Sequence, residues 1–175
     1  MIVSLSYQGQ SFGCDLSKPL DISLEVGQAK CFYAPDPIAE PLVAGDFIGA
    51  VKEGAPVNFF NLRLNPHGNG THTECLGHIT PEQNSVNQQL TNYHFFAQLV
   101  SVFCVKKEND DLVIDAESLK NTCPEGLPPA LIIRTLPNTS EKIGKDYSGT
   151  NPPYLTSDAM RFLVEKGVQH LLLDL

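Results

Sequence analysis

The stretch from residue 156 to residue 173, TSDAMRFLVEKGVQHLLL, indicates the fold class because it reads as one helix followed by one strand. Thr156 or Ser157 is of the type that caps a helix N-terminus with its side chain. Gly167 is the residue type that most often ends a helix. The apolar run Val168–Leu173 comes directly after it and predicts a buried strand. This stretch therefore predicts the second half of a β-α-β unit.

A strand for the first half of that unit is predicted at Ala130–Thr135, a short and mostly apolar run. A strand, a crossover helix and a second strand favour parallel pairing in one sheet. Further back along the chain, Leu99–Val105 and Leu112–Ile114 flank the polar sequence KKENDD and predict a hairpin. The chain is therefore expected to have an α/β fold.

The N-terminal part of the chain predicts more strands. Ile2–Tyr7 alternates apolar and polar residues, and a turn at Gln8–Gln10 separates it from a second strand over Ser11–Leu16. Ala34–Pro41 contains three prolines in eight residues and predicts an irregular loop. Further strands are predicted at Ile22–Val26, Phe47–Val51 and Val57–Leu64. With no repeat or linker in the sequence, we expect one domain over residues 1–175.

The composition excludes several classes of protein. The chain has 175 residues, of which 42% are hydrophobic and 18% are charged, and these values are typical of a soluble globular protein with no membrane span. The net charge of −8 argues against nucleic acid as the main partner, since phosphate binding requires a surplus of basic residues. The one adjacent basic pair, Lys106-Lys107, is followed at once by acidic residues.

The cysteines bear on the cellular compartment. They are odd in number, widely spaced and contain no C-x-x-C pair: Cys14, Cys31, Cys75, Cys104 and Cys123. The N-terminus shows no basic segment followed by a long apolar run, so no secretory signal is predicted. We therefore expect reduced thiols and a cytoplasmic protein.

A histidine-rich motif carries the chemistry. The sequence NPHGNGTHTECLGH, residues 65–78, contains His67, His72, Glu74 and His78, and its glycines make a helix unfavourable. In an extended segment, residues i and i+2 share a face, which places His72 beside Glu74. Imidazole and carboxylate ligands suit zinc, manganese or iron(II). The alternative is a hydrogen-bonded polar surface, and composition alone does not separate the two interpretations.

The sequence GTHTECLGH within this motif resembles the signature of the Putative cyclase family, H-x-G-T-H-x-D-x-P-x-H. That family includes bacterial arylformamidases (kynurenine formamidases) and isatin-hydrolase-like enzymes. Gly70, Thr71 and His72 match its G-T-H, and His78 matches its last histidine at the same spacing. Glu74 stands at the position of the family's aspartate.

The resemblance extends over nearly the whole chain. Asp15–Leu20, DLSKPL, resembles the family's opening D-L-S-x-P-L, and two later segments resemble its αβ region: Leu131–Thr135 and Gly167–Leu175. The departures concern the motif itself. The family's first histidine falls at Gly68, with His67 one place earlier, and the family's proline is Leu76.

The resemblance implies a swivelling β/β/α domain with a mixed sheet and a divalent metal, zinc or manganese. It implies a hydrolase that acts on C–N bonds other than peptide bonds, in a small-molecule amide, formamide or lactam. His72 and Glu74 would be metal ligands, with His67 as the third, and His78 would be the general base. The family takes a further His and Glu from a later segment, so we expect the chain to lack its C-terminal portion.

Two alternatives accompany this hypothesis. One is a non-catalytic protein that binds a metal or a small molecule on the same fold. The other is a structural metal site, which is disfavoured because such sites use Cys or His ligands at short paired spacings. For partners we expect a small-molecule substrate, no nucleic acid, no membrane, and assembly as a homodimer or a higher homo-oligomer.

Other residues of chemical interest are interpreted as structural. His94 lies beside two phenylalanines and His170 lies within an apolar run, so both are expected to pack rather than to bind a ligand. Cys75 has no assigned acid-base partner and is expected to be a buried thiol. Asp174 lies in a region that is near the active site in the family, although a structural role is favoured.

Overall fold

The computed structural model describes all residues from Met1 to Leu175. The chain forms two compact units, which are described separately. The first unit consists of residues 1–22, 75–139 and 151–175, and the second consists of residues 23–74 and 140–150. No helix has both the length and the apolar character needed to cross a lipid bilayer.

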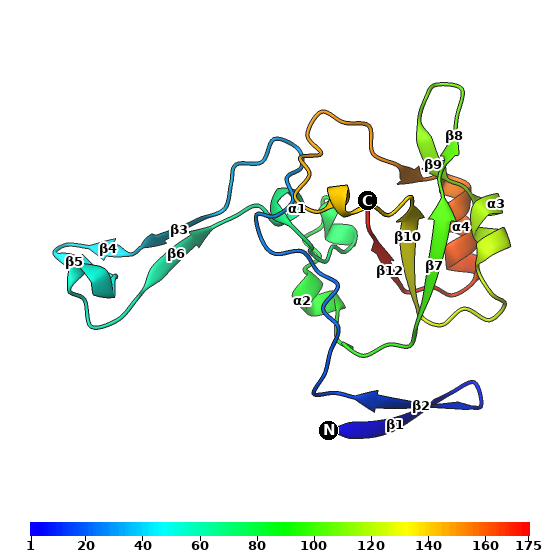
Figure 1. Ribbon diagram of the computed structural model, residues 1–175, viewed down its shortest axis with the longest axis horizontal. Coiled ribbons are helices and arrows are strands. Elements are labelled where there is room, and N and C mark those ends of the chain that lie inside the picture. Colours follow the sequence, from blue (N-terminus) through cyan, green and yellow to red (C-terminus); the bar gives the residue numbers. More distant parts are fainter. The chain divides into compact units, whose positions relative to one another are not determined.

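The main sheet of the first unit is parallel. Its strand order is β12-β10-β7 (Figure 1). Ile132 of the central strand pairs with Leu172 on one side and with Leu99 on the other. The strands are β7 (Ala97–Phe103), β10 (Ala130–Leu136) and β12 (His170–Leu173). The strand predicted at Ala130–Thr135 and its parallel pairing with the C-terminal strand are both confirmed.

The predicted helix is α4 (Ser157–Glu165). The Thr156 side chain accepts a hydrogen bond from Ala159 N at 3.2 Å, which satisfies one of the backbone donors at the helix start. Gly167 follows with φ of +77°, a conformation that glycine adopts without steric cost. The cap and the stop signal of this helix are therefore where the sequence predicts them.

A second helix packs with α4 and the sheet. It is α3 (Ala116–Thr122), and Asp115 caps it by accepting a hydrogen bond from Ser118 N at 3.0 Å. Apolar side chains from β7, β10, α3 and α4, together with Ile114 and Leu127, form a continuous buried core. Its members are Val100, Val102, Ile114, Leu119, Leu127, Leu131, Ile133, Ala159, Phe162 and Leu163.

Two smaller sheets complete the first unit. In one, β8 (Val105–Lys106) and β9 (Leu112–Ile114) form a hairpin, and β11 (Tyr154–Leu155) pairs with β9 in parallel. The prediction of a hairpin between Leu99–Val105 and Leu112–Ile114 is wrong for most of its first strand, because Ala97–Phe103 forms β7 of the parallel sheet. The other small sheet is the antiparallel pair β1 (Ile2–Tyr7) and β2 (Gln10–Asp15), as predicted. Parallel and antiparallel pairing thus occur together, and the α/β expectation with mixed sheets is confirmed. The unit also contains η2 (Leu76–His78) and α2 (Val86–Gln89).

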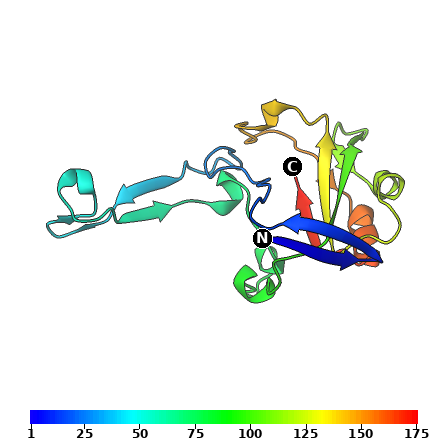
Figure 2. The ribbon, with the colours of Figure 1, turned by 60° about the horizontal axis from the view of Figure 1, so that its bottom comes forward.

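The second unit is built from hairpins and loops. β3 (Ile38–Pro41) pairs antiparallel with β6 (Phe60–Arg63), and β4 (Val43–Ala44) pairs with β5 (Phe47–Ile48). Figure 2 shows β3 and β6 as two long antiparallel arrows. The unit also has three short helical segments: η1 (Val51–Glu53), α1 (Pro66–Asn69) and η3 (Ser140–Lys142).

Three expectations for the second unit are wrong. Ile22–Val26 forms no strand, because its backbone is used elsewhere: Leu24 N donates to the Thr71 hydroxyl at 2.9 Å. The expected loop Ala34–Pro41 is a loop only in its first half, because Ile38–Pro41 forms β3. Of its three prolines, only Pro41 lies within the strand, as the last residue. The glycines did not exclude a helical turn at Pro66–Asn69, because proline favours the first position of a helix.

Candidate metal centre

The motif begins in a turn that one buried asparagine holds in place. Asn69 is only 1% exposed. Its side-chain oxygen accepts a hydrogen bond from Asn65 N at 2.7 Å, and its side-chain nitrogen donates to the Pro35 carbonyl at 3.0 Å. Its backbone carbonyl accepts a third bond from Gly27 N at 2.7 Å. No local sequence pattern predicts this role of Asn69, because its partners lie up to 42 residues away along the chain.

Gly68 lies where the family has its first histidine, and no side chain fits there. A Cβ at this position would lie 2.2 Å from the Ala34 Cβ and 3.0 Å from the Cys31 carbonyl oxygen. The Gly68 carbonyl also accepts a hydrogen bond from Cys31 N at 3.1 Å. The close backbone approach therefore requires glycine, and the histidine of this turn is the neighbouring His67.

His67 and His72 converge on one carboxylate oxygen. Glu74 Oε1 lies 2.5 Å from His67 Nδ1 and 2.9 Å from His72 Nε2. The two imidazole rings meet edge to face, with centroids 4.9 Å apart and an interplanar angle of 82°. The sequence prediction that His72 and Glu74 lie side by side is confirmed by this contact. The same contacts bring His67 into the group.

A backbone carbonyl sets the tautomer of His72. Its Nδ1 lies 2.9 Å from the Gly70 carbonyl oxygen, and because a carbonyl only accepts, Nδ1 carries the proton and donates it. In the neutral ring, Nε2 then has a lone pair directed at Glu74 Oε1, which is itself an acceptor. Such an arrangement is favourable when a proton or a metal cation lies between the two atoms.

The electrostatics of His72 agree with this geometry. Partial burial lowers the pKa of His72, but the hydrogen bond to the Gly70 carbonyl and the contact with Glu74 outweigh it, so the net pKa is raised. The surroundings thus stabilise positive charge at this imidazole.

The donor set fits a divalent metal. Two imidazole nitrogens and a carboxylate oxygen are ligands that zinc and manganese accept. Metal bonds of about 2.0–2.1 Å place neighbouring tetrahedral ligands roughly 3.3 Å apart, so each histidine nitrogen would have to move away from Glu74 Oε1 by less than about 1 Å. The exposed fractions of the His67, His72 and Glu74 side chains are 41%, 27% and 40%, so all three are open to solvent.

His78 belongs to the first unit. It is the last residue of η2, is exposed, and follows Glu74 by four residues in the sequence. Its backbone nitrogen donates to the Cys75 carbonyl at 2.9 Å, which closes the turn. Cys75 is half-buried, and its thiol donates to the Asn84 carbonyl at 3.1 Å.

His170 and Asp174 have structural surroundings, but the expectation that His94 packs against its neighbours is wrong, because His94 is exposed. The His170 ring packs on Phe95 with centroids 3.7 Å apart, whereas His94 is exposed. Asp174 accepts hydrogen bonds from the backbone nitrogen and the hydroxyl of Thr135, both at 2.9 Å, and so ties β10 to the chain after β12.

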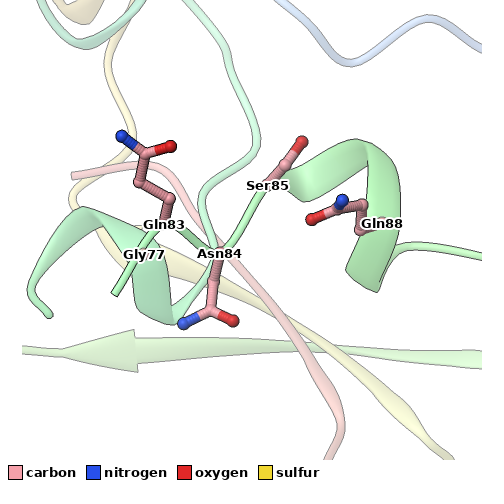
Figure 3. A pocket seen from close by; sticks show the side chains of 5 residues that line it. All are labelled: Gly77, Gln83, Asn84, Ser85 and Gln88. Atoms are coloured by element: carbon pink, nitrogen blue, oxygen red, sulfur yellow. The ribbon is translucent and has the colours of Figure 1, made fainter. Parts of the chain in front are cut away.

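A polar hollow lies next to η2 within the first unit. It has a volume of about 390 Å³ and is lined by Gly77, Gln83, Asn84, Ser85 and Gln88 (Figure 3). Figure 3 shows the Gln83 and Asn84 side chains pointing in opposite directions from the same segment. The lining offers amide and hydroxyl groups without formal charge. The sequence analysis missed it, although the polar run EQNSVNQQ at residues 82–89 is a visible signal.

The comparison with family models agrees with the motif. The model of the family described as Putative cyclase matches residues 14–175, a range that includes both the turn at Gly68 and the parallel sheet. No curated protein matches the chain. Because the match covers far more than half of the sequence, the chain belongs to the Putative cyclase family.

Proposed function

We propose that the protein is a metal-dependent hydrolase that cleaves a C–N bond other than a peptide bond, in a small-molecule amide, formamide or lactam. The observation that carries this proposal is the convergence of His67 Nδ1 and His72 Nε2 on a single oxygen of Glu74. Membership of a family of cyclase-like enzymes supports it. A zinc or manganese ion is the cofactor that this ligand set favours.

In this proposal His67 and His72 bind the ion through Nδ1 and Nε2, and Glu74 binds through its carboxylate. The Gly70 carbonyl keeps the proton on the other nitrogen of His72, which leaves Nε2 available. A bound ion would supply the Lewis acidity needed to activate water and to polarise the substrate carbonyl. His78 accepts a proton from the attacking water and delivers it to the leaving nitrogen, as a general base and then a general acid.

We further propose that the fold is the swivelling β/β/α domain of the family. The parallel order β12-β10-β7 with α3 and α4 against it, and the antiparallel pair β1-β2, support this assignment. The second candidate function is a non-catalytic metal- or small-molecule-binding protein on the same fold. Gly68 favours that alternative, since the family's first histidine is absent and has no room.

Metal binding and turnover separate the two candidates. We expect the purified chain to bind Zn²⁺ or Mn²⁺ in a calorimetric titration, and to hydrolyse an N-formyl aromatic amine when loaded. Glu74→Gln removes a charged ligand and should weaken metal affinity by about tenfold or more. His78→Ala should abolish turnover with metal content almost unchanged, because a base is not a ligand.

The matched control is His94→Ala, which removes an exposed histidine outside the motif and should change neither metal affinity nor turnover. Metal binding without hydrolysis of any formamide, amide or lactam tested would support the binding protein. If His78→Ala loses metal as readily as Glu74→Gln, the division between ligands and base is incorrect.

A further inference from the structure

A second hollow of the first unit lies between helices α3 and α4. Figure 1 shows the two helices side by side, and they are in direct contact. The hollow has a volume of about 370 Å³, which is a size typical of small-molecule sites. Six residues line this interhelical hollow: Ala116, Lys120, Asp158, Arg161, Phe162 and Glu165. None of them belongs to the histidine motif, and no step of the proposed hydrolysis uses them.

The charges of the interhelical hollow are balanced in sign, although the chain as a whole has a net charge of −8. Two lining residues are basic and two are acidic. Arg161 Nη1 and Asp158 Oδ1 form an ion pair at 2.8 Å, so these two charges largely neutralise each other. Lys120 and Glu165 are the other two, and neither forms an ion pair. A ligand that complements the hollow therefore offers one negative and one positive group.

These two unpaired charges come from different helices. Lys120 lies in the last turn of α3, and Glu165 is the last residue of α4. A molecule between the helices can therefore contact both side chains. Phe162, which is 8% exposed, and the half-buried Ala116 add apolar surface to the lining. Apolar surface with a few polar groups that converge on it is the usual composition of a small-molecule site.

The position of Glu165 favours a cation beside it. The C-terminal end of a helix carries partial negative charge, which repels an anionic side chain. The last turn of α4 contains no basic residue. Lys166, the next residue, places its amine over the Phe162 ring, 5.6 Å from the centroid, and forms no ion pair with Glu165. An ammonium group of a ligand would relieve the repulsion at this helix end.

We propose that the interhelical hollow binds a small zwitterion, a molecule with one carboxylate and one ammonium group, such as an amino acid. The carboxylate contacts Lys120, and the ammonium contacts Glu165 at the C-terminal end of α4. The carbon atoms between the two groups pack on Phe162 and Ala116. Both charged groups are necessary, because a simple anion would leave Glu165 without a cation and a simple amine would leave Lys120 without an anion. This site does not depend on the proposed hydrolysis.

An NMR titration of the purified chain with glycine, β-alanine and γ-aminobutyrate tests this proposal. These zwitterions have the same end groups and differ in the length of carbon chain between them. At least one should bind saturably, with the amide shifts concentrated in Ala116–Thr122 and Ser157–Glu165. Propionate and propylamine each carry only one of the two charges and should bind about tenfold more weakly or worse. Raising the salt concentration should weaken the binding of the zwitterion, because salt screens exposed charges.

Substitutions of the two unpaired residues test the assigned contacts. Lys120→Gln and Glu165→Gln each remove one charge and should each weaken the binding by about tenfold or more. Their effects on stability should be opposite in sign, because a cation is favourable and an anion unfavourable at a helix C-terminus. A loss of binding common to both variants is therefore not explained by a change in stability.

The matched controls are Lys18→Gln and Glu125→Gln, which remove exposed charges elsewhere in the first unit and should leave the binding unchanged. The proposal is overturned if no zwitterion binds at concentrations up to about 0.1 M. Amide shifts outside the two helices, for example at the histidine motif, also overturn it. So does binding of propionate or propylamine as tight as that of the zwitterions. A loss of binding in only one of the two site variants, or an equal loss in the controls, has the same consequence.

Discussion

The two units of the chain are each stabilised internally by a different kind of interaction. The first unit buries large aliphatic side chains between a parallel sheet and two helices. In the second unit the only buried hydrophobic residues are Ala29 and Ala50, and its buried polar residue is Asn69. The proposed ligands His67, His72 and Glu74 all belong to the second unit. The difference teaches that backbone hydrogen bonds and close approaches of small residues, rather than a large apolar core, position these ligands.

The largest expected effect comes from a substitution that disrupts the buried core of the first unit. Leu131 is fully buried near the start of β10, so Leu131→Ala should lower the free energy of unfolding by about 2–5 kcal/mol in a urea titration. Val164→Ala is the control, because Val164 lies on α4 and is 70% exposed, and it should change stability by at most about 0.5 kcal/mol. Similar costs for the two variants would mean that the first unit has no tightly packed core.

A substitution of intermediate expected effect tests whether close approaches of small residues stabilise the second unit. Gly68→Ala brings a methyl group against the Ala34 Cβ and the Cys31 carbonyl, and should cost about 1–3 kcal/mol. Because the turn would shift, metal affinity should fall as well. Hydrogen exchange should place the loss of protection in the second unit and leave β10 protected. Gly13→Ala, which meets no atom within 4 Å, should be nearly neutral. Unchanged metal affinity in Gly68→Ala would contradict the importance of this close approach.

The smallest expected effect concerns a helix cap of the first unit. Two hydrogen bonds from Ser118 hold the pKa of Asp115 below its ordinary value of 3.8, and Lys107 adds to this. A lowered folded-state pKa stabilises the protein above the unfolded-state pKa, and this stability is lost as the pH falls through the folded-state value. Asp115→Asn keeps the accepting oxygen without the charge, so it should cost about 0.3–1 kcal/mol at neutral pH.

Urea titrations of the natural chain and Asp115→Asn should therefore converge as the pH is lowered from about 7 to about 2.5. Asp115→Ala removes the cap entirely and should keep a deficit at every pH, of about 1 kcal/mol near neutrality. A difference between the natural chain and Asp115→Asn that does not depend on pH would show that the charge of Asp115 contributes nothing.

The features that could be predicted from the sequence are those that depend on residues close to one another along the chain. The cap at Thr156, the stop at Gly167 and the alternation of β1 depend on residues within one element, and each lies where expected. The i, i+2 contact between His72 and Glu74 is equally local. The bond from Asn69 to the Pro35 carbonyl depends on two distant segments meeting, which no local pattern reveals. The absence of a strand at Ile22–Val26 has the same origin, since Leu24 bonds to Thr71, 47 residues away.

The bond from His72 Nδ1 to the Gly70 carbonyl has an evolutionary consequence. The group that fixes the tautomer of this histidine is part of the main chain, so no single side-chain replacement deletes it. Substitutions at neighbouring positions act on it only by altering the path of the backbone. Insertion or deletion of one residue between Gly70 and His72 would separate the two atoms. Homologous sequences should therefore tolerate amino-acid substitutions around this turn while keeping the number of residues in it constant.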